Sequence, residues 1–357
     1  MKFPIYASAG ILLTLGSFGS ASTASATSRG AVAAPPKFYV EVGVLPHHHP
    51  QKLQDVVRAT GTGAITGTVR CPWAKAFVLS VVASGNQTFF VQCGKLSSGP
   101  NPDLKQTRIF RFRVTTAGRT TAYSPVPGGT FSSRLDDMAA SANGAELAVN
   151  VSSRTNPLKD KIVMINVKTG ARANWTGGVM PGGEIFTGGD LSLTSNGKKL
   201  AVFGAARCPK GSAPGTCKSP GEEMRLVSQA PAGGKLASGR MVFRKSQLSN
   251  RSEYINDAFI AARGTTVTAA VVGAGLSSFV EVLNVSVATG KPRQAEFKRE
   301  DSGSSFYYSY VSPDPSGRWV LIDAGSPSRD NRGWIDHGKL VLLKPTRADI
   351  FGEAWSS

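Results

Sequence analysis

The chain has 357 residues and a formal net charge of +18, from 41 Lys and Arg against 23 Asp and Glu. This length allows two domains or one large all-β domain. The basic residues are dispersed, in runs no longer than Lys198-Lys199, Arg244-Lys245 and Lys298-Arg299. They predict a solvated basic shell attracted to an anionic cell envelope, and they exclude the concentrated charge of a specific nucleic-acid reader.

The first 26 residues have the layout of a secretory signal peptide. Lys2 precedes an apolar run from Ile5 to Phe18, and small residues follow as far as Ala24-Ser25-Ala26. The run is too short to anchor in a membrane, and no later segment is apolar enough to span one. We expect residues 1–26 to be a signal peptide, 27–36 a disordered leader and 37–357 a single domain of a protein that is secreted, extracellular or envelope-associated.

The first predicted strand runs from Phe38 to Gly43, and a loop with three histidines, His47 to His49, follows it. Adjacent side chains of an extended backbone point to opposite faces, so the sequence favours a solvated loop tip over a metal site there. Asp55 to Ala59 and Ile65 to Arg70 then form a hairpin around glycine-rich residues 60–63.

A different hairpin recurs along the rest of the chain, and its clearest copy runs from Tyr310 to Asp323. A turn of Pro, Asp, Ser and Gly separates two runs of branched and aromatic residues there. The turns of the five copies contain Gly85, Gly144, Gly197, Gly264 and Gly317. A second hairpin follows the first four copies, with turns at Ala117-Gly118, Thr169-Gly170, Gly233-Gly234 and Thr289-Gly290. After the fifth copy, Lys339 to Leu343 forms a strand with no evident returning partner.

These paired hairpins predict a β-propeller. Successive turn glycines are 59, 53, 67 and 53 residues apart by their numbers, which fits four-stranded blades with loop insertions. A partial unit at each end gives six blades, with seven as the alternative. Pairing of Phe38 to Val42 with the tail from Asp349 to Trp355 would close the ring and cover its strand edges.

The four cysteines predict two disulfides in an exported chain. Cys208 and Cys217 bracket a loop without a hydrophobic pattern, which leaves Cys71 and Cys93 to pair between neighbouring hairpins. The C-x₂-C spacing of a zinc site is absent.

The repeat resembles those of a known family. The unit from Ser312 to Ile322, together with Thr-Gly hairpins such as Val167 to Arg172, resembles the WD40-like and TolB-like propeller repeats of exported bacterial proteins. The resemblance extends from Phe38 to Leu343. It implies a fold and not a function, because related propellers are enzymes, binding modules and assembly platforms. The Trp-Asp and Gly-His pairs of true WD40 blades are absent.

One polar position recurs in the repeat. Counting back seven residues from each turn glycine gives Asp137, Asp190, Asp257, Tyr310 and Val78. These residues would begin the innermost strands and approach the central channel. The carboxylates could hold a divalent cation or act as acid and base; alternatively, each could accept backbone N–H bonds that lock neighbouring blades together. We expect no other cofactor.

An aromatic group marks the last blade. Tyr307, Tyr308 and Trp334 could form a binding patch for sugars or peptides, or they could pack at the seam where the ring closes. Gly333 to Lys339 fits the spacing G-x-x-x-x-G-K, but Leu340 stands where Ser or Thr would hold magnesium. The predicted strand after it also differs from the helix that a phosphate loop needs.

The sequence therefore predicts a secreted, non-enzymatic scaffold that uses propeller loops or the channel mouth to bind a protein, peptide or glycan. We expect a monomer without a transmembrane segment. The alternative is an extracellular propeller hydrolase or lactonase with a carboxylate-lined channel.

Overall fold

The computed structural model describes residues 36–44, 54–85, 87–96, 104–133, 135–152, 160–177, 185–207, 221–247, 253–261, 263–273, 277–302, 308–314, 319–326, 329–330, 333–336, 338–343 and 352–355. They all belong to one compact unit, Pro35–Ser357. The predicted signal peptide and the leader up to residue 35 lie outside the described residues. Nowhere in the described part is there a helix long and apolar enough to cross a bilayer.

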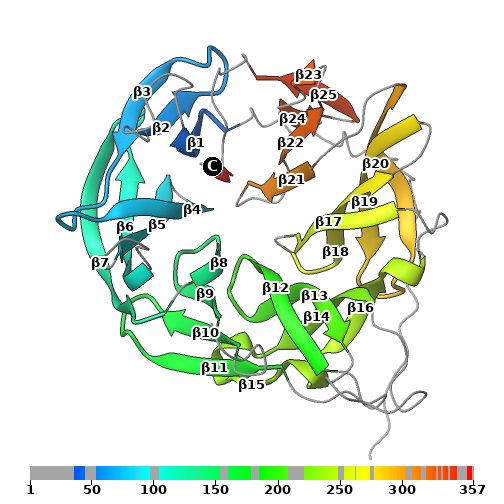
Figure 1. Cartoon of the computed structure of the whole chain (residues 1–357), viewed down its shortest axis with the longest axis horizontal. Coiled ribbons are helices and arrows are strands. Elements are labelled where there is room, and N and C mark those ends of the chain that lie inside the picture. Colours follow the sequence, from blue (N-terminus) through cyan, green and yellow to red (C-terminus); the bar gives the residue numbers. More distant parts are fainter. Residues whose placement is uncertain are drawn as a thin grey trace, which may run out of the picture. The chain divides into compact units, whose positions relative to one another are not determined.

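Six mostly antiparallel sheets stand around a ring (Figure 1). From the centre outward, the first blade contains β4 (Phe77–Ser84), β5 (Thr88–Leu96), β6 (Leu104–Val114) and β7 (Thr120–Phe131). The second contains β8 (Leu135–Ala140), β9 (Glu146–Val151), β10 (Lys161–Asn166) and β11 (Arg172–Thr176). The third contains β12 (Ile185–Leu193), β13 (Lys199–Arg207), β14 (Glu222–Ser228) and β16 (Arg240–Arg244).

The fourth blade contains β17 (Glu253–Ile260), β18 (Thr266–Gly273), β19 (Ser277–Ser286) and β20 (Pro292–Ser302). The fifth contains β21 (Tyr308–Pro313), β22 (Val320–Ser326), β24 (Gly333–Asp336) and β25 (Lys339–Leu342), and the short β23 (Arg329–Asp330) also pairs with β22. The segment Lys339–Leu342, for which the sequence showed no partner, is thus itself the returning strand of β24.

The sixth blade joins the two ends of the unit and closes the ring. It contains β26 (Gly352–Trp355), β1 (Phe38–Val44), β2 (Gln54–Ala59) and β3 (Ile65–Val69). β26 is antiparallel to β1, with Tyr39 opposite Trp355 and Val42 opposite Gly352. The six-bladed propeller and its closure by terminal strands are therefore confirmed, and β26 covers the edge of β1.

The core lies between adjacent blades. The six inner strands β4, β8, β12, β17, β21 and β26 each contact the next around the ring. Between the sixth and first blades, Phe38 and Val40 of β1 pack with Phe89 and Phe112, whose stacked ring centroids are 5.3 Å apart. Burying a side chain of this size stabilises the fold by about 1.5–3 kcal/mol, so each blade is held chiefly by its neighbours.

One predicted turn is wrong, although its hairpin forms, because β14 returns as β16 in an antiparallel pair. Gly233-Gly234 does not form a tight turn; residues 229–239 run out to the second blade through the 3₁₀ turns Ala230–Ala232 and Leu236–Ser238. Between these turns, β15 (Gly234–Lys235) pairs in parallel with β11. The indole Nε1–H of Trp175 donates to the carbonyl of Ala230 at 2.7 Å. Gly234 is needed because a Cβ there would lie 2.9 Å from the Trp175 ring.

The turns of each blade gather at one end of the unit. In five blades, a backbone hydrogen bond joins the turn after the third strand to the residue just before the second strand. These bonds run from Thr60 N–H to Lys37 O, Val114 N–H to Gln87 O, Val167 N–H to Ala145 O, Ala230 N–H to Lys198 O and Val287 N–H to Thr265 O. Two further bonds join turns of successive blades, Gly85 N–H to Ala142 O and Asn143 N–H to Ser195 O. We call this end the turn face and the opposite end, where the inner strands begin, the entry face.

A disulfide joins Cys71, in the segment that precedes β4, to Cys93 of β5, with 5.7 Å between their Cα atoms. This pairing agrees with one of the two predicted bridges. Cys208 and Cys217 lie outside the described residues.

Candidate functional site

The channel carboxylates lie at a structural irregularity that the inner strands share. The pairing register shifts between Leu135 and Asp137 in β8, between Gly188 and Leu191 in β12, and between Ile255 and Asp257 in β17. Such β-bulges bend a strand and re-aim the neighbouring side chains. Asp137, Asp190 and Asp257 therefore sit at, or directly after, a bulge near the entry face.

The corresponding position in the first blade is Ser80 and not Val78. The bulge of β4 lies between these two residues, and Ser80 pairs with Gln92 as Asp137 pairs with Asn150. The count from Gly85 is two residues off because the turn after β4 is shorter than its equivalents. Val78 is instead a buried core residue.

Asp137 binds the next blade. Its Oδ2 accepts a hydrogen bond from the backbone N–H of Leu191 at 2.5 Å, which links β8 to β12. The side-chain amide of Asn150, opposite Asp137, donates to the carbonyl of Gly189 at 3.2 Å in the same bulge. The preceding blade junction repeats this arrangement, with the Gln92 amide donating to the carbonyl of Leu135 at 3.2 Å. These side chains therefore hydrogen-bond the backbone of the next blade and hold neighbouring blades together.

The electrostatics of Asp137 and Asp190 depart from those of ordinary carboxylates. Burial, together with the nearby Asp190 charge, raises the pKa of Asp137 to about 7, although the Leu191 and Met138 N–H groups favour its ionised form. Burial raises the pKa of Asp190 to about 6. Both carboxyl groups therefore gain and lose their protons near neutral pH, which is the range that a general acid or base needs.

The structure brings two more predicted residues to the ring of inner strands. The backbone of Asp257 lies in β17 and that of Tyr310 in β21, where Tyr310 pairs with Asp323. Their side chains lie outside the described residues. Among the side chains that are described, no group of three or more His, Cys, Asp or Glu is placed to hold a metal ion. Asp137 and Asp190 are thus the only two of the predicted acids whose side-chain surroundings are described.

The predicted aromatic patch is described only in part. Trp334 lies in β24, is half-buried, and packs against the buried cluster of Tyr39, Leu321 and Leu343 between the fifth and sixth blades. Tyr307 and the side chain of Tyr308 lie outside the described residues. Trp334 therefore contributes to the packing between two blades.

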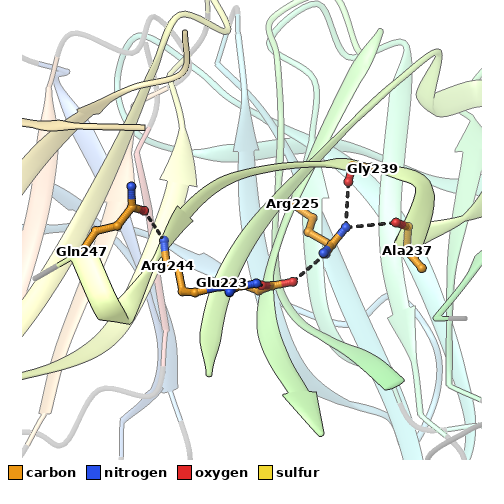
Figure 2. A network of polar contacts seen from close by, with 6 residues as sticks. All are labelled: Glu223, Arg225, Ala237, Gly239, Arg244 and Gln247. Atoms are coloured by element: carbon orange, nitrogen blue, oxygen red, sulfur yellow. Dashed lines mark hydrogen bonds and ion pairs between the residues drawn. The ribbon is translucent and has the colours of Figure 1, made fainter. Parts of the chain in front are cut away.

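The third blade contains a buried charged network that the sequence analysis did not predict (Figure 2). Glu223 is fully buried and pairs through Oε1 with Arg225 Nε at 2.6 Å and through Oε2 with Arg244 Nη2 at 2.7 Å. Arg225 Nη1 also donates to the carbonyls of Ala237 at 3.0 Å and Gly239 at 2.8 Å. The network fastens the 229–239 connection to β14. A Glu and an Arg two residues apart in a predicted strand share one face, and that spacing was the available signal.

Comparisons with known proteins bear on the fold alone. No family model and no curated protein matches the chain. Among solved structures, TolB from Acinetobacter baumannii matches with a TM-score of 0.56 and 12% identity, over 90% of this chain and 67% of that one. The chain thus has a TolB-like β-propeller fold.

Weaker likenesses extend to enzymes. An acylaminoacyl peptidase in complex with Z-Gly-Gly-Phe-chloromethyl ketone gives a TM-score of 0.45 at 10% identity, over 74% of this chain and 39% of that one. A Synechocystis apocarotenoid oxygenase gives 0.44 at 9% identity, over 85% and 70%. These values are too low to support an argument about chemistry.

Proposed function

We propose that the protein is an exported, monomeric, non-enzymatic scaffold that binds a partner through its propeller loops or channel mouth. The Asp137 contact with Leu191 carries this proposal. A carboxylate that joins two blades has a structural task, and moving a proton or a metal through it would disturb the junction. The acids of the channel then serve the fold, and the surface serves the function.

The distribution of charge supports an anionic partner. Two of the acids, Glu41 and Glu223, are fully buried in ion pairs with Arg58 and Arg225. Asp137 and Asp190 hold part of their protons at neutral pH because of their raised pKa values. Each ion pair removes one charge of either sign, so the excess of Lys and Arg over Asp and Glu stays on the rest of the chain, and such an excess attracts anionic proteins, peptides or glycans.

Replacement of the channel acids tests the proposal. Asp137→Ala and Asp190→Ala should leave the purified chain without any stoichiometric cation, as in the unchanged protein, and Asp137→Ala should lower the melting temperature. The scaffold proposal fails if metal analysis finds a bound cation whose removal leaves the fold intact and abolishes hydrolysis of an ester or lactone panel.

A second candidate, a propeller hydrolase or lactonase, is favoured by one observation. Asp137 and Asp190 have pKa values of about 7 and about 6, which suit a general acid and a general base. A hydrolase of this kind would show a bell-shaped pH–rate profile with limbs near these values, and Asp190→Asn would remove one limb. Activity without such limbs, or no activity on the panel, excludes it.

A further inference from the structure

Positive charge collects on the turn face. The turns of five successive blades carry six exposed basic residues: Lys37, Arg119, Lys168, Lys198, Arg263 and Lys291. The same turns carry one acid, Glu146, which is half-buried and accepts a hydrogen bond from the Asn166 amide at 2.9 Å. In the fifth blade, the described charged residues of the turns are Asp314, which is buried and accepts a hydrogen bond from the Trp319 N–H at 2.6 Å, and Asp336 and Lys339 of the β24–β25 turn.

The charges of these six side chains are not neutralised within the part of the chain that the structure describes. None of them forms an ion pair or a side-chain hydrogen bond with a described residue. The partly buried Arg58 and the buried Arg225 differ, since they are paired with Glu41 and Glu223. Like charges that are held around one ring repel each other, and an external anion would relieve this repulsion.

The entry face has a different composition. Its described acids include Asp55, Asp136 and Asp160, and its described bases include Arg70, Lys75 and Lys161. The described residues of the entry face thus carry both signs, whereas the exposed charges described in the turns named above are all basic.

The chemistry of the turn face favours electrostatic contact over an apolar interface. Its turn tips consist largely of Gly, Asn, Ser, Thr and Ala besides the basic residues. Of the exposed large hydrophobic side chains in the described part, only Ile65 adjoins one of these turns. Protein interfaces are usually built around buried aromatic anchors, and membrane-inserting surfaces need apolar side chains. The described turn tips offer neither.

The placement of the six basic residues around the ring indicates which kind of anionic partner fits. Each of five successive blades contributes at least one of the six basic residues, and the hydrogen-bonded turns lie at one end of the ring. A flat anionic surface contacts all of them at once, whereas an extended polymer follows only a few. We propose that the turn face docks peripherally on an anionic lipid surface. This inference rests on the proposed binding function and names the surface that performs it.

Vesicle binding by the full chain tests the inference. We expect the protein to sediment with vesicles of equal parts phosphatidylglycerol and phosphatidylcholine and not with phosphatidylcholine alone. Binding should disappear as added salt shortens the Debye length from about 10 Å to about 3 Å. A Lys or Arg near an anionic surface contributes about a factor of five, so Lys168→Glu, Lys198→Glu and Lys291→Glu together should weaken binding at least about a hundredfold.

The entry face supplies a matched control. Arg70→Glu, Lys75→Glu and Lys161→Glu change the net charge by the same amount and should leave vesicle binding within a few-fold of the unchanged protein. If the turn-face triple variant does not reach the native melting temperature, Lys168→Gln, Lys198→Gln and Lys291→Gln replace it, with a smaller loss expected.

Three results would overturn the inference: no binding to anionic vesicles at low salt, equal losses in both triple variants, or binding of soluble polyphosphate without binding of vesicles. These results leave the scaffold proposal standing, because that proposal is decided by metal content and hydrolysis. Conversely, a metal-dependent hydrolase activity would overturn the scaffold proposal, while the vesicle experiment would still decide whether the turn face binds anionic lipid.

Discussion

The carboxylate of Asp137 joins β8 to the bulge of β12 in the next blade. Its position follows from the turn glycine seven residues later. Its partner, the N–H of Leu191, is 54 residues away and is presented by a bulge in another blade. No residue type indicates where a backbone N–H points at a bulge, so both the catalytic and the structural interpretations of Asp137 were compatible with the sequence.

The pair of acids makes stability depend on pH. An acid whose pKa is higher in the folded chain than in the unfolded chain binds extra protons when folded, so the free energy of unfolding falls as pH rises from about 4 toward about 7. Asp190→Asn removes the charge that helps to raise the pKa of Asp137. The melting temperature of this variant should therefore fall less than that of the unchanged protein between about pH 5 and about pH 8.

Asp136→Asn is the control for that measurement, because Asp136 is exposed and is the smallest of the causes that raise the pKa of Asp137. A variant at Asp190 whose melting temperature depends on pH as strongly as the unchanged protein's would contradict the coupling of the two acids.

Glu223 gives a second prediction for a single side chain. Glu223→Gln removes the charge that balances the buried Arg225, and breaking such a pair costs about 3–5 kcal/mol. The urea midpoint should fall accordingly. Glu222→Gln is a matched control, since Glu222 precedes it in β14 and its buried Oε2 accepts no hydrogen bond from a described residue. Equal effects of the two substitutions would show that the network does not act as a balanced pair.

Single elements were predictable where the turn chemistry is local. Asn-Gly and Thr-Gly turns need backbone conformations that glycine adopts readily, and Gly144, Gly170, Gly197 and Gly290 all have positive φ. Gly233 and Gly234 also have positive φ, yet they serve a strand added to another blade. A glycine indicates the backbone conformation at its position but not which segment lies beside it, so this long connection could not be distinguished from a tight turn.

The closing strand β26 provides a test at the scale of one element. Ending the chain after Leu343 removes the strand that pairs with β1 and leaves the backbone edge of β1 exposed. Exposed edges pair with other chains, so we expect a lower melting temperature and concentration-dependent association in light scattering. Deleting only Ser356 and Ser357 should change neither property. A monomeric truncation product with an unchanged melting temperature would mean that β26 adds little to the ring.

At the scale of the whole molecule, the number of blades could be read from the sequence but the clustering of basic residues on the turn face could not. Equal spacing of turn glycines implies equivalent blades, and equivalence implies a ring. The charges appeared dispersed because the turns that carry them are about 50 residues apart, as the period of the repeat requires. A local signal existed: Arg119, Lys198 and Lys291 each follow a turn glycine, and Arg263 precedes one.

The clustering of basic residues on the turn face predicts how salt acts on folding. Repulsion among the six basic residues of the turn face opposes the folded state, because unfolding separates them. Added salt screens exposed charges, so the melting temperature should rise by a few degrees from low to physiological ionic strength. The variant with Lys168→Glu, Lys198→Glu and Lys291→Glu replaces repulsion by attraction and should melt higher at low salt, with a flatter or inverted salt response. The variant with Arg70→Glu, Lys75→Glu and Lys161→Glu lies on a face of mixed charge and should gain less. Identical responses of the two variants would mean that net charge, and not its placement on the turn face, controls stability.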